Sequence, residues 1–285
     1  MHCLGGAGGS KVRCMKRRFS NLRSFSIVCG LVLVGTAPGC AGQDPTASAV
    51  AAFNTYVGAV EARLAQQHRS QEGFLAGGAA SGQGADRLRR GELVVEQLTP
   101  ASDTAWSGAM LHHWRGTAFA PGATAADFER LMKDFNGYPQ HFSPQVTEAR
   151  VLTQQGDHVQ AEMRVRQKHG ITVVMDTAYD VTFGWLDAQH GWSDSRSTRI
   201  AEIDAAGTAK ERVLSASEEH GFLWRMNTYW SYEQQDGGLY MQIESVSLTR
   251  AIPTGLGWLI GPFVESIPRE SLEFTLRSAC SAIRK

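Results

Sequence analysis

The chain has little net charge, little cysteine beyond its first forty residues and no long hydrophobic run. Its formal net charge is +0, with 28 Lys and Arg against 28 Asp and Glu. A protein whose main partner is nucleic acid usually carries a basic surface. We therefore expect no nucleic-acid partner.

Cysteine and histidine do not point to a metal site. Four of the five cysteines lie within the first forty residues, which leaves Cys280 alone in the remainder. One cysteine can form neither an internal disulfide nor a cysteine-based metal site. His112 and His113 are adjacent on an expected strand, so their side chains point to opposite faces and cannot readily hold one ion together. We expect no metal and no other cofactor.

Residues 1–41 have the order of a secretory signal peptide. Basic residues from Lys11 to Arg23 precede a short apolar run at residues 25–34, and small residues follow. The apolar run is too short to span a bilayer. We expect the chain to be exported from a bacterial cytoplasm.

Cys40 allows two interpretations of how this leader ends. The sequence Ala37-Pro38-Gly39-Cys40 resembles a bacterial lipobox, although Pro38 is unusual there. Lipidation of Cys40 would tether the protein to a membrane, whereas ordinary cleavage near Ala41 would release it into the periplasm. Both a lipoprotein and a periplasmic protein therefore remain open.

Residues 44–90 are expected to form an amphipathic helical arm and a flexible linker. Val50, Phe53, Val57, Val60 and Leu64 recur at helical spacing within residues 46–69. Residues 73–84 are rich in glycine and alanine, which is typical of a flexible linker. We expect the helix to pack on the main domain, with contact to a partner or a membrane as the alternative.

Residues 91–285 read as a meander of strands followed by one long helix. Within residues 171–185, apolar side chains alternate with polar ones, which predicts a sheet with one dry and one wet face. Short Gly and Asp turns join this strand to its neighbours, which favours antiparallel pairing. Residues 124–135 have the pattern of a helix, and residues 256–283 are expected to be largely helical.

Several segments of this domain resemble the START-like superfamily, which includes polyketide cyclase/dehydrase-like proteins, StAR-related lipid-transfer domains and birch-pollen-allergen-like proteins. The resemblance lies in the order of elements and in five segments: Pro121-Gly122-Ala123-Thr124, Asn136-Gly137-Tyr138-Pro139, residues 221–230, Asp236-Gly237-Gly238, and residues 267–272.

The resemblance implies an α+β helix-grip fold over residues 91–285. In that fold, a curved antiparallel sheet of about six to seven strands packs on the long C-terminal helix, with a hydrophobic pocket between them. No catalytic set carries over from the superfamily to residues of this chain.

The ligand in such a pocket would be a hydrophobic small molecule or a lipid. Methionine and aromatic side chains can line an adaptable pocket, and a fully packed core is the alternative. The residues expected to contact the ligand share the dry face of the sheet: Met163, Met175, Tyr179, Phe183, Trp185, Trp224, Met226 and Met241.

The opposite face of the sheet carries polar side chains, among them Asn227, Tyr229, Gln242 and Glu244. We expect this face to be solvated, with pairs across the strands. A contact to a polar headgroup is the alternative, if curvature brings this face inward.

Three functions follow from these features. The first is an exported protein that binds or transfers a lipid-like ligand. The second is a cyclase or dehydratase acting on a hydrophobic or aromatic substrate, which would need an ionisable group inside the pocket. The third is a membrane-tethered interaction module with a packed core. We expect binding rather than catalysis, and the sequence indicates no oligomeric state.

Overall fold

The computed structural model describes residues 44–100, 106, 108–169, 171–252 and 257–283. The expected signal peptide and Cys40 lie outside the described residues. Within the described part of the chain, no helix is both long and apolar enough to cross a membrane.

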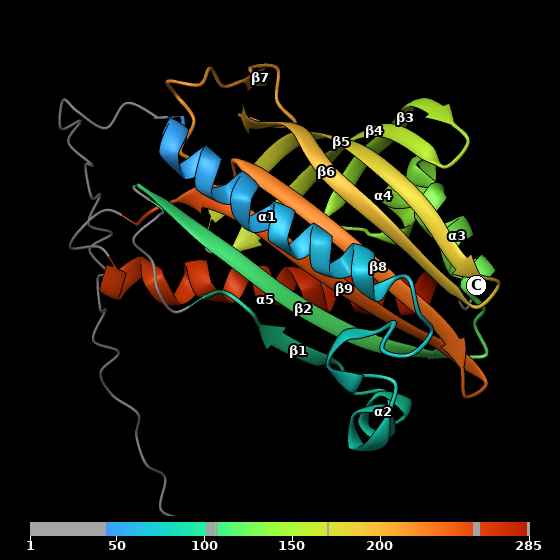
Figure 1. Cartoon of the computed structure of the whole chain (residues 1–285). Helices are drawn as coiled ribbons and strands as arrows, with labels where there is room; N and C mark the ends of the chain where they lie inside the picture. The colour runs from blue at the N-terminus through green and yellow to red at the C-terminus, as the bar shows by residue number, and fades with distance from the viewer. Residues whose placement is uncertain (1–43, 101–105, 107, 170, 253–256, 284–285) are drawn as a thin grey trace, which may run out of the picture. The chain divides into compact units, whose positions relative to one another are not determined.

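The domain is built on one curved sheet that does not close into a barrel (Figure 1). Its strand order is β1-β2-β9-β8-β6-β5-β4-β3, and each neighbouring pair is antiparallel. The long strands are β2 (Ala109–Pro121), β3 (Val146–Gln155), β4 (His158–His169), β5 (Ile171–Asp187), β6 (His190–Asp204), β8 (Arg225–Gln235) and β9 (Gly238–Arg250). The short strand β1 (Val94–Gln97) extends the edge at β2.

Within the described residues the sheet has nine strands, more than the six to seven expected. One of the additional strands, β7 (Arg212–Val213), pairs with the end of β6. This pair is only two residues long, so it leaves no periodic signal in the sequence.

The C-terminal helix α5 (Gly257–Ile283) packs against the inner face of the sheet along β2. Leu272 and Leu276 approach β2 at Gly116, where a Cβ atom would overlap both leucine side chains. Glycine at this position therefore lets the helix lie close to the strand. The predicted α+β helix-grip fold is confirmed.

A helical segment between β2 and β3 covers the part of the inner face that α5 does not reach. It comprises α3 (Ala125–Lys133), the 3-10 turn η2 (Phe135–Gly137) and the short helix α4 (Tyr138–His141). Thr124 and Asp127 form a capping box at the start of α3, which satisfies backbone N–H groups that the first turn would otherwise leave unpaired.

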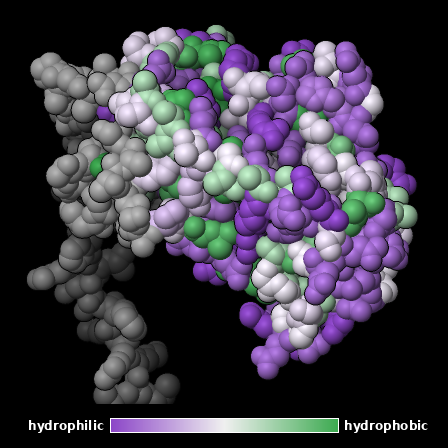
Figure 2. Space-filling model, viewed as in Figure 1, coloured by the Kyte–Doolittle hydropathy of each residue, from purple (hydrophilic) through white to green (hydrophobic). Residues whose placement is uncertain are grey.

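Helix α1 (Ala47–Gln67) lies across the opposite, outer face of the sheet (Figure 1). Its apolar residues Phe53, Val57, Val60 and Leu64 are buried among residues of β2, β8 and β9. Burying each of these larger side chains contributes roughly 1.5–3 kcal/mol. Seen from the α1 side, the surface is mostly hydrophilic with small scattered hydrophobic groups (Figure 2), because the apolar stripe of α1 faces the sheet.

The segment that follows α1 also packs on the outer face. It carries the 3-10 turn η1 (Ala76–Gly78) and helix α2 (Gly82–Arg89). Phe74 and Leu75 are buried there with Tyr240 of β9. The glycine-rich residues 73–84 thus contain η1 and the first residues of α2, beside a small apolar cluster.

Candidate functional site: a cavity under the sheet

A cavity of about 200 Å³ lies between the inner face of the sheet, the α3–α4 segment and helix α5. It forms where the sheet curves away from α5, which is held close to β2 at Gly116. Apolar side chains make up most of the described lining. These are Met132, Phe135, Tyr138, Phe142, Val146, Met163, Val165, Met175, Tyr179, Val181, Phe183, Leu223, Met226, Trp230, Ile243 and Phe274.

One wall of the cavity is an aromatic cluster from η2, α4 and the turn that follows. The rings of Phe135 and Phe142 flank that of Tyr138, each with centroids 4.8 Å away. The Tyr138 hydroxyl donates a hydrogen bond to the backbone carbonyl of Met132 at 2.8 Å. Burial and the nearby Asp134 charge raise the pKa of Tyr138, so its phenol stays neutral and holds the wall in place.

The floor of the cavity is formed by alternate residues of the long strands. Met163, Met175, Tyr179, Phe183 and Met226, five of the eight residues expected to contact a ligand, line it. They come from β4, β5 and β8, and strand alternation brings them to one face. Flexible methionine side chains can adjust to ligands of different shape.

The other three expected residues lie outside the cavity. Trp185 is on the same face at the far end of β5, where it is 36% exposed and donates its Nε1–H to Glu129 at 3.0 Å. Met241 is fully buried in the packed part of the core. Trp224 packs against α1 on the outer face because β8 begins only at Arg225, so alternation does not extend back to it.

The lining also contains hydroxyl groups that the sequence analysis did not single out. Ser193 and Ser195 of β6 and Thr228 of β8 lie on the floor, and Ser271 and Thr275 project from α5. The signal was present: serines at 193, 195 and 197 alternate along β6 and so share one face.

The described lining residues include no Asp, Glu, His, Lys or Arg. Burial raises the pKa of the Tyr179 phenol to about 12, which keeps it neutral at ordinary pH. The cavity is therefore suited to enclosing an uncharged molecule and offering it hydrogen bonds, because burying a charge without a partner is costly.

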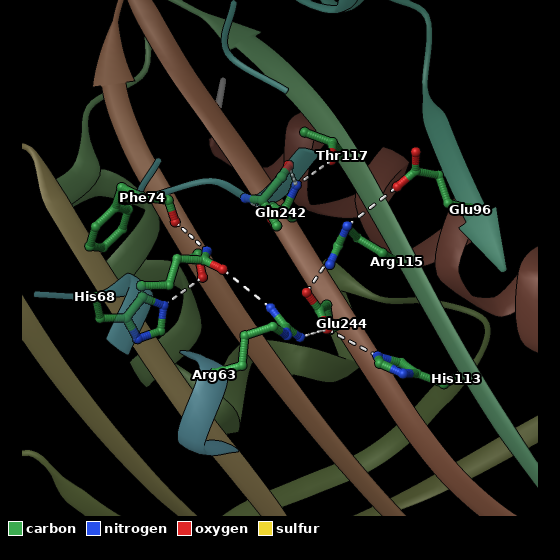
Figure 3. Close-up of polar contacts among 12 residues, drawn as sticks. Arg63, His68, Phe74, Glu96, His113, Arg115, Thr117, Gln242 and Glu244 are labelled. Atoms are coloured by element: carbon green, nitrogen blue, oxygen red, sulfur yellow. Dashed lines mark hydrogen bonds and ion pairs between the residues drawn. The ribbon is translucent and has the colours of Figure 1, made fainter. Parts of the chain in front are cut away.

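The outer face differs from expectation, because α1 covers it and buries its polar residues. Figure 3 shows the Glu244 carboxylate between Arg63, His113 and Arg115. Arg115 Nε and His113 Nε2 lie 2.9 and 3.0 Å from its oxygens, and only 2% of the Glu244 side chain is exposed. Burial alone would raise the pKa of Glu244, but the hydrogen bond from His113 and the two arginine charges outweigh it and lower the pKa to about 2.

A second polar group lies nearer the start of α1. Glu61 of α1 accepts hydrogen bonds from the Tyr229 hydroxyl at 2.9 Å and from Arg196 Nε at 2.6 Å. The neighbouring Asp194 has one carboxylate oxygen buried without a hydrogen-bond partner. Burial raises the pKa of Asp194 to about 6, which Arg196 opposes and Glu61 reinforces. These contacts attach α1 to the sheet.

The fold and the cavity define a helix-grip protein with a largely apolar internal site. No family model matches this chain, and no curated protein matches its sequence. Three similar solved structures are a STAR-related lipid transfer protein from Xanthomonas axonopodis, the Zhui aromatase/cyclase from Streptomyces sp. R1128 and a START superfamily protein from Mycobacterium smegmatis.

The similarity to these structures is low but extends over most of their lengths. The Xanthomonas protein is 17% identical, with 67% of this chain and 99% of that one covered and a TM-score of 0.42. The corresponding values are 13%, 61%, 94% and 0.39 for the Streptomyces protein, and 14%, 62%, 97% and 0.37 for the Mycobacterium protein.

Proposed function

We propose that this protein is an exported protein that binds or transfers a small hydrophobic molecule in the cavity between the sheet and the C-terminal helix. The cavity is the observation that carries the proposal: about 200 Å³ of space lined largely by aromatic, aliphatic and methionine side chains. Protein interiors are close-packed, and an empty void of this volume would cost on the order of 5 kcal/mol. A bound molecule would recover those lost contacts.

Binding is favoured over cyclase or dehydratase chemistry by the residues that line the cavity. Acid–base catalysis needs a side chain that exchanges protons near the working pH. Among the described lining residues, the titratable side chains are the phenols of Tyr138 and Tyr179, and burial raises the pKa of both. Ligand binding without catalysis therefore requires only apolar contacts and hydrogen bonds.

The interaction-module alternative requires a filled core and an arm free to bind a partner. The cavity and the burial of the α1 apolar stripe both argue against it. A membrane tether remains part of the proposal only through lipid attachment at Cys40.

The binding proposal is tested by native mass spectrometry on the full chain, purified from a bacterial host, with solvent extraction of anything bound. Ser195→Trp, which places a large side chain in the cavity, is the matched control. We expect a discrete bound mass, or thermal stabilisation by members of a lipid panel, in the wild type and not in the variant. A clean apo mass with no stabilisation by the panel would contradict the proposal.

Export rests on the order of residues 1–41 and has its own test. After expression in a bacterium, the mature N-terminus is identified by mass spectrometry in the wild type and in Cys40→Ser. A lipid-modified N-terminus at Cys40 that Cys40→Ser abolishes supports a lipoprotein. Cleavage near Ala41 in both proteins supports a periplasmic protein, and an uncleaved chain in the cytoplasm would contradict export.

A further inference from the structure

Part of the cavity floor belongs to a row of hydroxyl groups that crosses three strands. Ser195 of β6 pairs directly with Thr228 of β8, and Thr228 pairs directly with Ser245 of β9. Directly opposed residues have Cβ atoms about 4.5–5.5 Å apart, so the three hydroxyls form one continuous row. We call Ser195, Thr228 and Ser245 the hydroxyl row.

The hydroxyl row has unused hydrogen-bonding capacity. Within the described residues, none of its three side chains makes a hydrogen bond, and Ser195 and Thr228 line the cavity directly. The row ends beside Trp114 of β2, the pairing partner of Ser245. The indole Nε1–H of Trp114 is buried without a hydrogen-bond partner. The three hydroxyl residues are half-buried and the Trp114 Nε1–H is buried, so a ligand or water that enters the cavity can supply hydrogen bonds that the protein itself does not.

The charge around the cavity limits what that ligand can be. Lys133 lies 5.0 Å from the centroid of the Phe183 ring, but its ammonium group is already held by Glu129 and Asp157, each at 2.8 Å. The described lining itself holds no charged residue. An ionised acid would enter without a counter-charge, and that is costly in an apolar site. Hydroxyl groups can pair with a neutral hydroxyl or carbonyl at no such cost.

Size and wall chemistry limit the ligand further. The cavity volume of about 200 Å³ is larger than an engineered cavity of about 150 Å³ that binds benzene. Phe135, Tyr138 and Phe142 stand on one side and Trp230 on another, and aromatic rings pack well against rings. The cavity therefore has room for a ligand with a single ring or with two fused rings.

We infer that the cavity takes an uncharged molecule of one or two rings that carries a hydroxyl or carbonyl oxygen, with the rings among the aromatic residues and the oxygen on the hydroxyl row. This inference rests on the proposed function and makes it more specific. It favours neutral ring alcohols, phenols and ketones over fatty acids and other anions.

The test uses three probes with the same ring system: naphthalene, 2-naphthol and 2-naphthoate. Binding to the full chain at pH 7 is measured by calorimetry or fluorescence. A neutral hydrogen bond contributes enough free energy for 2-naphthol to bind about 3- to 10-fold more tightly than naphthalene. The anion 2-naphthoate is expected to bind at least about 10-fold more weakly than 2-naphthol.

The variants Ser195→Ala and Thr228→Val remove hydroxyls while preserving a similar volume. We expect them to weaken 2-naphthol binding about 3- to 10-fold and to leave naphthalene binding unchanged. Thr172→Val, at an exposed position of β5, is the control and should change neither. Measuring each probe on each variant separates a lost hydrogen bond from a general disturbance of the cavity, which would weaken both probes.

The outcomes separate this inference from the proposed function. If all three probes bind with similar affinity, or if 2-naphthoate binds best, the cavity binds ligands but the preference for neutral oxygen-bearing rings is wrong. The same holds if the hydroxyl variants leave 2-naphthol binding unchanged. If none of the probes binds and native mass spectrometry shows no bound species, the proposed function itself fails, and the inference with it.

Discussion

The two faces of the sheet are both covered by helices, yet they are stabilised in different ways. On the outer face, α1 buries charged residues that are paired with one another, with Glu244 at the centre of one group. On the inner face, the α3–α4 segment and α5 leave a cavity with unpaired hydroxyls and no charged residue in its described lining. The outer face is therefore suited to stabilising the fold, and the inner face is suited to binding a ligand.

The largest expected effect on stability is at the centre of the outer face. Glu244→Gln removes the negative charge and leaves Arg63 and Arg115 without it. Removing one partner of a buried ion pair costs roughly 3–5 kcal/mol, and we expect a loss of about 3 kcal/mol in the free energy of unfolding at pH 7. Denaturant unfolding measures it. Glu148→Gln, which removes an exposed partner of Arg164, should cost less than about 0.5 kcal/mol.

The sign of the pH dependence follows from the lowered pKa of Glu244. Its stabilising contribution is present above the unfolded pKa near 4.5 and is lost as the pH falls towards about 2. The free energy of unfolding of Glu244→Gln should therefore fall less steeply with decreasing pH in the acid range than that of the wild type. An equally steep fall in the variant would show that other groups control acid unfolding.

The next effect is at the close contact between α5 and β2. Gly116→Ala places a Cβ atom against Leu272 and Leu276, and forcing extra volume into a packed contact costs typically 1–3 kcal/mol. Gly58→Ala in α1 is the matched control, because a Cβ atom there meets nothing within 4 Å. That change should stabilise the protein by about 0.5–1 kcal/mol. Equal effects of the two substitutions on the unfolding free energy would contradict the close contact.

A smaller effect, of opposite sign, is expected at Asp194 on the outer face. Its pKa is raised from 3.8 to about 6, so the folded state binds a proton more readily and stability falls as the pH rises through that interval. Asp194→Asn removes the buried charge and should add at most about 3 kcal/mol well above pH 6 and nothing below pH 4. Unfolding curves at pH 3.5 and pH 8 check this, and a loss of stability at pH 8 would contradict it.

The smallest effect on stability is expected in the cavity. Ser195→Trp adds volume where space exists, so the unfolding free energy should change by less than about 1 kcal/mol while ligand binding is lost. A large destabilisation without loss of binding would mean that Ser195 faces packed core. On the inner face, Ser195→Trp should thus abolish ligand binding with little change in the free energy of unfolding. On the outer face, Glu244→Gln should lower the free energy of unfolding and leave ligand binding in the cavity unchanged.

The sequence predicts the inner face better than the outer one, for a physical reason. Alternation depends only on strand geometry, so it placed Met175, Tyr179 and Phe183 together on the face that lines the cavity. It cannot locate where a strand begins, which is why Trp224 lies on the other face. Nor can it distinguish open space from packed core on one face, as Met241 shows.

Predicting the burial of the outer face requires information that the pattern of a strand does not contain. The apolar stripe of residues 46–69 showed that this helix must bury one side, but not against which surface. Because α1 covers the outer face, polar residues expected in solvent, such as Tyr229 and Glu244, are buried and paired. A contact between residues 61 and 229, or 63 and 244, leaves no periodic signal along the chain.

Methionine methyl NMR tests the central claim most directly. Met132, Met163, Met175 and Met226 line the cavity, whereas Met241 lies in the packed core. With ¹³C-methyl methionine in the full chain, titration with 2-naphthol should shift the four lining methyl resonances together and the Met241 resonance least. If the four resonances stay in place, or if Met241 moves as far as they do, the claim that this cavity holds the ligand is contradicted.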